Sequence, residues 1–306
     1  MTSTTVVLEF LLFPGLLFTV LAGLLTSWVD RKVTAMVQMR VGPPLLQPFY
    51  DLRKYFIKET CVPEGGAIGL FLAAPLIGFA GVTLASMILW RTFIDSETTF
   101  IGDLILLIYL LMMPALGVVL GAFASRNPLA SIGGSREIKL MIAYELPLVL
   151  ALLVPVIQAE SIRLGDLVNV TPAASVSGAL AVLVAVACVQ AKLTIVPFDM
   201  PEAETELSGG VFIEYSGPPL GVYKLTRAMM LFTMPVFVTA LFFGGIATAP
   251  GLAAKLWGVL IWFVLVALTV VLRNTTPRVR IDQAVKFFWG PVSLVALLAV
   301  VLAWLG

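Results

Sequence analysis

Eight apolar stretches, each long enough or nearly long enough to cross a bilayer, constrain the fold of this chain more than any other feature. A helix needs about 20 apolar residues to span the hydrocarbon core of a membrane. These stretches recur along the whole chain and predict an all-α integral membrane protein. The expected spans are Val6–Trp28, Ile68–Trp90, Gly102–Ala124, Ile138–Gln158, Val176–Val196, Pro218–Phe243, Ala253–Leu272 and Phe287–Leu305.

The composition supports this assignment. Of the 306 residues, 60 % are hydrophobic and 12 % are charged, and the mean hydropathy is +1.04. A water-soluble domain of this composition would expose far too much apolar surface. The first span is too long for the apolar part of a signal peptide and follows no basic segment, so no cleavage is expected. We expect residues 1–306 to form a single polytopic membrane domain.

Two of the spans are expected to be irregular. The fourth contains Glu145, Pro147 and Pro155, and proline inside a helix produces a kink. The sixth begins at Gly217-Pro218-Pro219, which could interrupt a longer helix that starts near Gly210. The sequence therefore predicts about eight transmembrane helices, kinked and partly broken, with both termini on the same side.

The basic residues indicate which loops face the cytoplasm. Fourteen of the 19 Lys and Arg residues lie in or beside the odd-numbered loops, and only Arg91, Arg163 and Lys255 lie on the opposite side. Cytoplasmic loops carry the excess of basic residues. The expected cytoplasmic loops are about 29–67, 125–137, 197–217 and 273–286. Both termini are then expected outside, in a multi-pass protein of the plasma membrane.

The first cytoplasmic loop contains a segment with helical periodicity, residues 47–59. Its apolar residues Phe49, Leu52, Phe56 and Ile57 recur at helical spacing, with charged residues on the other face. This pattern predicts an amphipathic helix on the membrane surface. Such a helix could anchor the loop in the lipid interface or dock a partner protein.

An acidic segment, residues 197–217, is the most unusual polar feature because it holds five carboxylates and no Lys or Arg. Charge near membrane depth is costly and usually marks an ion path, a proton relay or a docking site. If Glu202 and Glu206 are helical, they share a face and repel each other, and crowding raises carboxyl pKa values. The five acids are Asp199, Glu202, Glu204, Glu206 and Glu214.

The acidic pattern by itself does not separate a proton relay, a cation entry site and a docking surface for a basic partner. A solvated loop that serves only solubility fits the segment less well. The reason is that proline, glycine and aromatic residues alternate with the acids in an otherwise apolar chain.

Two further acids lie outside this segment. Glu145 sits about a third of the way into the fourth span, where an unpaired carboxylate would be costly. It could be a proton-relay group or a structural acid that is hydrogen-bonded to a neighbouring helix. Asp282 lies close to Arg278 and Arg280, and we expect it to pair with one of them.

Several basic residues could contact the acids. Arg31, Lys32 and Arg40 could serve simply as positively charged anchors on the cytoplasmic side. Lys224 and Arg227 are three residues apart in the sixth span and therefore share one helix face. They could neutralise the acids just before them, or extend to the membrane interface.

The chain offers few ligands for a redox centre. It has two cysteines, Cys61 and Cys188, far apart in sequence, and no histidine. Iron–sulfur clusters need about four cysteine-type ligands, and haem and zinc sites rely on clustered His, Cys or Met. No nucleotide-binding motif or nucleophile triad is present. We expect no cofactor, no metal and no nucleic acid to be bound by this chain itself.

Four segments together resemble the complex I H-subunit family, whose members anchor the hydrophilic arm on the membrane arm. They occur in that family's order, cover the chain from end to end and accompany eight spans. The segments are Asp30-Arg-Lys32 with Gln38-Met-Arg-Val-Gly-Pro43 and Leu46-Gln-Pro48; Ala124-Ser-Arg-Asn127 through Ala143-Tyr-Glu145; Pro197-Phe-Asp-Met-Pro-Glu-Ala-Glu-Thr-Glu-Leu207 with Glu214-Tyr-Ser-Gly217; and Pro277-Arg-Val-Arg-Ile-Asp-Gln283.

Two departures refine the resemblance. The loop Arg40-Val-Gly-Pro-Pro-Leu-Leu-Gln-Pro48 is shorter than in complex I members. It looks like the version in membrane-bound nickel–iron (NiFe) hydrogenases and the related archaeal sulfane reductase. The complex I pattern also has an acid where this chain has Arg227, which argues against a complete complex I acid chain and quinone chamber.

The resemblance implies a subunit that anchors a peripheral electron-transfer arm and begins a row of charged residues in the membrane. Its implied partners are iron–sulfur and NiFe-type (or related) subunits, antiporter-like membrane subunits and the lipid bilayer. The implied coupling acids are Glu145, Asp199, Glu202, Glu204, Glu206 and Glu214. The implied docking or charge-pairing residues are Arg31, Lys32, Arg40, Lys224, Arg227, Arg278, Arg280 and Asp282.

Three functions are consistent with the sequence. The first is the anchor and coupling subunit of a ferredoxin-driven hydrogenase or sulfane reductase that pumps protons or sodium ions. The second is the equivalent subunit of a quinone-reducing complex. The third is a stand-alone secondary transporter with its site at the broken sixth helix, although no repeat of two halves is visible in the chain.

Overall fold

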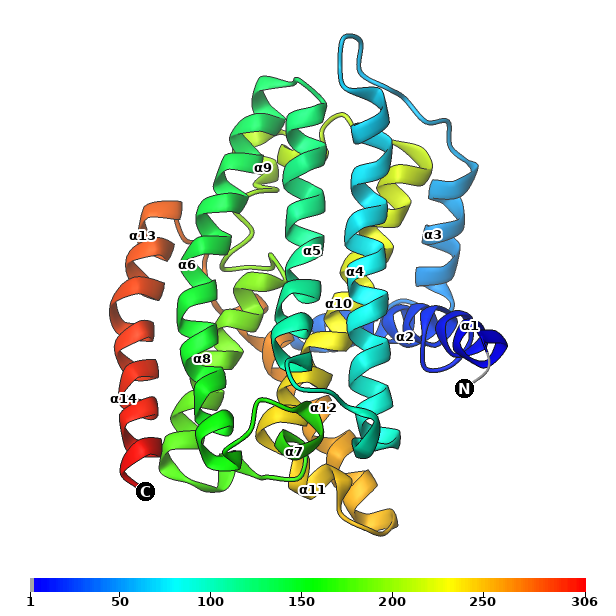
Figure 1. Cartoon of the computed structure of the whole chain (residues 1–306). Coiled ribbons are helices and arrows are strands. Elements are labelled where there is room, and N and C mark those ends of the chain that lie inside the picture. The colour runs from blue at the N-terminus through cyan, green and yellow to red at the C-terminus, as the bar shows by residue number, and fades with distance from the viewer. Residues whose placement is uncertain (1–2) are drawn as a thin grey trace.

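The computed structural model describes residues 3–306, with the side chains of residues 3–6, 204 and 205 left aside, and it is all-helical over that range (Figure 1). This confirms the predicted fold class. The α-helices are α1 (Ser3–Leu11), α2 (Leu16–Val37), α3 (Gln47–Ile57), α4 (Ile68–Ile94), α5 (Asp103–Ala124), α6 (Pro128–Ala159), α7 (Leu164–Leu167), α8 (Val176–Lys192), α9 (Glu204–Leu207), α10 (Gly217–Phe242), α11 (Gly244–Thr248), α12 (Leu252–Thr275), α13 (Ile281–Phe287) and α14 (Ser293–Leu305). Short turns are η1 (Ser96–Thr98), η2 (Pro172–Ala174), η3 (Gly210–Phe212) and the π-helical η4 (Phe288–Val292).

Within the described residues, seven spans are long and apolar enough to cross a membrane, and a bent pair of helices brings the number to eight, by length and composition. The bent pair joins residues 164–174 to α8 at 105°. Ser175 begins α8 as its N-cap, because its extended backbone stops the preceding turn and its hydroxyl accepts a hydrogen bond from the Gly178 amide. The prediction of about eight partly broken spans is confirmed, but the break lies in the fifth span. The sixth, where a break at Gly217-Pro218-Pro219 was considered, is the continuous helix α10.

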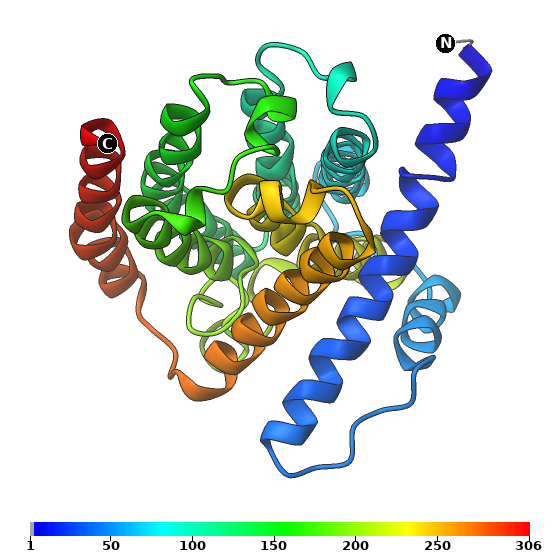
Figure 2. The same ribbon diagram turned by 90° about the horizontal axis from the view of Figure 1, so that it is seen from below.

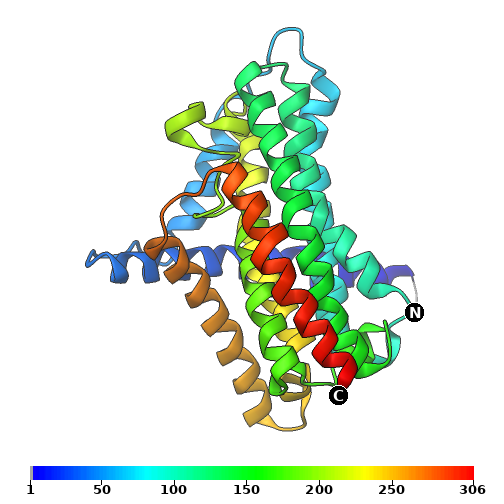
Figure 3. The ribbon, with the colours of Figure 1, turned by 90° about the vertical axis from the view of Figure 1, so that its left-hand side faces the viewer.

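The helix α10 is the centre of the bundle. In its most apolar stretch 83 % of the residues are buried inside the protein, against 22 % in α12 and 28 % in the span that ends with α14. Helices α4, α5, α6, α8 and α10 run side by side, and α14 covers α6 and α8 (Figures 1 and 3). The peripheral helices α12 and α14 therefore leave most of their apolar surface for lipid or neighbouring subunits.

The helix α2 does not run along the bundle but across it (Figures 1 and 3). The Thr19 hydroxyl donates to the Ser86 hydroxyl of α4 at 2.9 Å, and Gly23 lies against the backbone of α10 at Met229. The helix also continues past Trp28 to Val37, because no glycine or proline interrupts the sequence before Gly42. Residues 29–37, predicted to be loop, are therefore helical.

The predicted amphipathic helix forms as α3. Phe49 and Leu52 pack against the core, whereas Phe56 and Ile57 are 50 % and 71 % exposed. The helix stands beside α10, with its axis close to that of the bundle, instead of lying flat across it (Figure 1). Its inner face thereby forms one wall of a cavity.

The helix α6 begins at Pro128, ten residues earlier than the predicted fourth span. Asn127 caps it, since its side-chain oxygen accepts a hydrogen bond from the Leu129 amide at 2.8 Å, and proline suits the first helical position. Most of the predicted loop 125–137 is therefore helix. This early start carries residues 136 and 137 into the packed part of the bundle.

Candidate functional site

The acidic segment folds into the protein as an irregular loop with one helical turn, α9, and the turn η3. Phe198, Met200 and Leu207 are each only 5 % exposed and anchor it among the helices. Gly210 has a φ of +53° and lies against the Pro201 carbonyl oxygen, so a side chain there would clash. The segment is therefore a packed element and not a solvated loop.

The described acids of this segment have separate partners. Asp199 pairs with Arg278 at 2.6 Å, and Glu206 pairs with Arg136 at 2.7 Å. Glu214 accepts a hydrogen bond of 2.6 Å from the Asn127 side chain. The side chain of Glu204 lies outside the described residues.

Glu202 pairs with two residues of α10, Arg227 and Lys224, and the Lys224 ammonium is 4.0 Å away. The expectation that Lys224 and Arg227 neutralise the acids before them is thereby confirmed. The shared helix face proposed for Glu202 and Glu206 is wrong, because α9 begins only at Glu204. Each of these two acids contacts a different helix.

The environments of Glu202 and Asp199 shift their pKa values in opposite directions. Burial raises the pKa of the Glu202 carboxyl, but the charges of Arg227 and Lys224 outweigh it and hold the pKa below its usual value. Burial raises the pKa of the Asp199 carboxyl, and Arg278 opposes that rise only in part. The expectation of raised pKa values from crowding is therefore wrong for Glu202. For Asp199 the direction is right, but burial is the main cause.

Glu145 forms an ion pair with Lys192 between α6 and α8. The Lys192 ammonium of α8 lies 3.1 Å from one carboxylate oxygen and 5.4 Å from the centre of the Tyr144 ring. The Lys192 side chain is 2 % exposed and that of Glu145 is 19 % exposed. From sequence, Lys192 was expected to border a cytoplasmic loop. Lys192 is the last residue of α8 and does border that loop, but its side chain is buried, because α8 packs closely against α6.

Glu137 is a site residue that the sequence prediction missed. It is 2 % exposed, and its Oε2 atom has no hydrogen-bond partner among the described residues. With Glu202, Lys192 and Arg227 it lines a small cavity of about 60 Å³, which is large enough to hold water. The signal was its spacing of eight residues from Glu145, which places both acids on one face of a helix. It was overlooked because α6 was expected to start after it.

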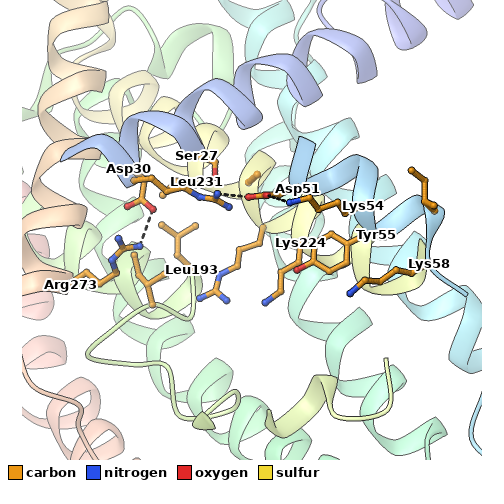
Figure 4. A pocket seen from close by; sticks show the side chains of 15 residues that line it. Ser27, Asp30, Asp51, Lys54, Tyr55, Lys58, Leu193, Lys224, Leu231 and Arg273 are labelled. Carbon is orange, nitrogen blue, oxygen red and sulfur yellow. Dashed lines mark hydrogen bonds and ion pairs between the residues drawn. The ribbon is translucent and has the colours of Figure 1, made fainter. Parts of the chain in front are cut away.

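A larger cavity of about 570 Å³ lies beside the acidic segment, between α2, α3, α10 and α12 (Figure 4). Asp30 pairs with Arg273 at 2.9 Å, and Arg31 pairs with Asp51 at 2.6 Å. The basic residues exceed the acidic ones, so the wall is electropositive. Its charged lining residues are Arg31, Lys54, Lys58, Lys224, Arg227, Arg273, Asp30 and Asp51.

The remaining predicted charges are placed differently. Lys32 and Arg40 are not among the described residues that line this cavity, and neither forms an ion pair with a described side chain. The pairing expected for Asp282 is also wrong. Arg278 pairs with Asp199, and Asp282 has no ionic partner in the described part of the chain. Asp282 lies instead in the first turn of α13, where the helix dipole favours an acid, beside Arg280 at the N-cap.

Arg227 connects the parts of the site. It pairs with Glu202, donates a 2.7 Å hydrogen bond to the Thr194 carbonyl and lines both cavities. A row of charged groups thus leads from Asp199 through Glu202 and Arg227 to Glu137, and on to Glu145. Among the residues with described side chains, no group of three His, Cys, Asp or Glu is placed to hold a metal ion.

The sequence is similar to a known family of membrane proteins over almost its whole length. The NADH dehydrogenase family matches residues 10–304. The H subunit of the NADH-quinone oxidoreductase of Brevibacillus brevis is 33 % identical over 319 residues, covering 96 % of this chain and 92 % of that protein. The protein of the same name in Geobacillus kaustophilus is 36 % identical over 294 residues, covering 90 % of this chain and 88 % of that protein.

The fold also has a close structural counterpart. A chain of the membrane-bound sulfane sulfur reductase, an archaeal respiratory membrane complex, superposes with a TM-score of 0.83 at 27 % identity. The match covers 94 % of this chain and 96 % of that chain. This chain therefore belongs to the NADH dehydrogenase family that includes the H subunits of complex I, and it is a multi-span membrane component of a respiratory complex.

Proposed function

We propose that this chain is the membrane-anchor and coupling subunit of a ferredoxin-driven respiratory complex of the membrane-bound hydrogenase or sulfane reductase type. The chain lies in the plasma membrane and docks a peripheral arm, which carries iron–sulfur clusters and a NiFe or related site. It links the redox reaction of that arm to the translocation of protons or sodium ions by antiporter-like partner subunits.

The row of buried and half-buried charges carries this proposal. Glu202 and Arg227, Glu137, and the Glu145–Lys192 pair come from three helices and one loop, yet they lie around one small cavity or next to it. Buried ion pairs cost desolvation energy and are a weak means of stabilising a protein. Charges kept in the interior of a membrane protein usually mark an ion or proton path. A change in charge at the acidic segment would therefore be felt at Glu145.

The charged lining of the larger cavity favours the ferredoxin-driven type. Eight charged residues surround it, and six of them are basic. A quinone carries an apolar tail, and sites for such ligands are mostly apolar with few polar groups. The shortened loop at Arg40–Pro48 and the structural likeness to the sulfane reductase chain support the same assignment.

The alternative is a quinone-site subunit of a complex I-like oxidoreductase. Its support is the name of the curated relatives, which are H subunits of NADH-quinone oxidoreductases, at 33 % to 36 % identity. The cavity of about 570 Å³ also has the volume of an ordinary ligand site. Assay of the purified complex with ferredoxin and with a soluble quinone distinguishes the two types. The hydrogenase or sulfane reductase type should oxidise ferredoxin without reducing quinone, whereas the complex I-like type should reduce quinone.

The coupling role is tested in proteoliposomes that contain the assembled complex. We expect Glu145→Gln and Glu137→Gln to suppress ion translocation, while ferredoxin-linked electron transfer in detergent persists. Glutamine keeps an oxygen that can accept a hydrogen bond from the Lys192 ammonium, so the fold should be retained.

Glu64→Gln is the matched control, because Glu64 is exposed in the loop 60–67 at the same end of the bundle. It should leave both ion translocation and electron transfer unchanged. Normal pumping by both assembled interior variants would exclude the coupling role.

A further inference from the structure

An apolar groove of about 530 Å³ lies towards the end of the bundle opposite to the acidic segment. Its walls come from the start of α2, the ends of α4 and α10, α11 and the start of α12. Figure 2 shows the N-terminal half of α2 passing beside the start of α12. The groove belongs neither to the charged row nor to the cavity of Figure 4.

Aromatic side chains that pack against one another form one wall of the groove. Trp90 stacks on Phe232 with ring centres 6.1 Å apart, and Phe18 meets Trp90 edge-on at 5.1 Å. Trp262 completes the wall and donates a hydrogen bond to the Phe232 carbonyl at 3.3 Å. The indole nitrogen of Trp90 is buried and has no partner among the described residues.

Among the described residues that line the groove, Lys255 is the only charged one. It is exposed and forms no ion pair within residues 3–306. It also lies in the first turn of α12, where the helix dipole disfavours a positive charge. A cation in this position, beside an apolar groove and without a partner in the chain, is complementary to an amphiphile with an anionic head.

We infer that this groove binds an anionic glycerophospholipid, with an acyl chain along the aromatic wall and the phosphate at Lys255. The surrounding membrane supplies such molecules, and Trp residues such as those of this wall are enriched at the level of the lipid headgroups. A transmembrane helix of a partner is about 10 Å across, so about 530 Å³ would hold little more than one of its turns. The volume therefore suits a lipid chain better than a helix.

The site has a structural consequence. The lipid would fill the space between the inclined helix α2 and helices α4, α10 and α12. Filling this space would hold α2 against the bundle, and α2 also carries Asp30 and Arg31 of the electropositive cavity.

The test uses the full-length chain purified in a non-ionic detergent and supplied with phosphatidylglycerol or phosphatidylcholine. Native mass spectrometry measures the lipid retained, and thermal unfolding measures stabilisation. We expect one phosphatidylglycerol to be retained in preference to phosphatidylcholine and to raise the Tm. Lys255→Gln should reduce the preference about fivefold, the size of one lysine–anionic lipid interaction.

Two further variants separate the groove from the lysine. Ala22→Phe, which fills the groove, should abolish retention of both lipids, whereas Leu21→Phe on the outward face of the same helix should not. Equal retention of the two lipids by the wild type, or an unchanged preference in Lys255→Gln, would overturn the inference. Loss of retention in Leu21→Phe as well as Ala22→Phe would also count against a defined groove site. The lysine variant decides the matter even if Ala22→Phe fails to fold.

Discussion

Lys192 and Glu145 show how a single ion pair can determine the free-energy cost of burying a charged side chain. An ammonium that is 2 % exposed would be strongly unfavourable without its carboxylate 3.1 Å away and the Tyr144 ring beside it. Either partner alone would be an uncompensated charge in an apolar bundle. The pair explains why neither residue can be assigned a role in isolation.

The first prediction concerns this pair. Glu145→Leu should lower the free energy of unfolding by about 3–5 kcal/mol, because it leaves the Lys192 ammonium buried and unpaired. The double variant Glu145→Leu with Lys192→Met should recover most of that loss, since no charge remains. Denaturant titration in detergent measures both. A double variant no more stable than Glu145→Leu would show that the pair does not set the energetics of this position.

The second prediction concerns the pH dependence of Glu202. Its folded pKa lies below the ordinary value of 4.5, so the unfolded chain binds more protons at this position than the folded chain does. The stabilisation is therefore present above about pH 4.5 and is lost as the pH falls through the folded pKa. The Tm difference between wild type and Glu202→Gln should be largest near neutrality and shrink below about pH 4.5. A difference that grows on acidification would contradict this sign.

At the scale of helices, close approach of α2 to α10 is what allows α2 to cross the bundle. A Cβ atom on Gly23 would lie 2.9 Å from the backbone nitrogen and Cα of Met229. Backbone atoms of a packed helix cannot move aside as a flexible side chain can, and small residues are what permit such crossings between membrane helices. The inclination of α2 therefore depends on this glycine together with the Thr19–Ser86 hydrogen bond.

The third prediction follows from that approach. Gly23→Ala should destabilise the protein by about 1–3 kcal/mol, the usual cost of overpacking a tight contact. Gly69→Ala in α4 is the matched control, because a Cβ there meets nothing within 4 Å, and its effect should stay within about 0.5 kcal/mol. Thermal unfolding of the two purified variants makes the comparison. Equal effects would mean that the crossing is not tightly packed.

At the scale of the whole molecule, several helix connections lie at one or the other end of the bundle. The loops 60–67 and 125–127 lie at one end, with α9 and η3 near them, and the loops 95–102, 160–175 and 243–251 lie at the other, with the C-terminus (Figures 1 and 3). The acidic segment and the electropositive cavity thus share the end that the basic residues assign to the cytoplasm. This is the end at which a peripheral arm would dock under the proposed function.

The fourth prediction tests that orientation with a native residue. Cys61 is exposed in the loop 60–67, whereas Cys188 is buried. A membrane-impermeant maleimide should label Cys61 in inverted vesicles stripped of peripheral subunits, but not in right-side-out vesicles. Rebinding of the peripheral arm should protect it.

Cys61→Ser should abolish the labelling and thereby identify the modified thiol. Preferential labelling in right-side-out vesicles would reverse the orientation of the chain. Labelling unaffected by the peripheral arm would place the docking surface elsewhere.

Much of the fold could be read from the sequence because the signals are local. Span length and apolar composition depend only on neighbouring residues, so eight spans, their approximate places and the helix at 47–57 were predictable. Helix boundaries were less so. The start of α6 depends on its N-cap residue. The end of α2 depends on the absence of glycine and proline from a polar stretch of sequence. Hydropathy registers neither signal.

The sequence by itself determined an all-helical membrane protein with an acidic segment, and it pointed to the complex I H-subunit family. Only the tertiary structure decided which charges meet. Lys192 reaches Glu145 from 47 residues away, Arg278 takes Asp199 and not Asp282 as its partner, and Glu137 becomes part of the site. The physical reason is that composition and periodicity fix the environment of a segment, whereas an ion pair forms only where helices distant in the chain approach within a few ångströms.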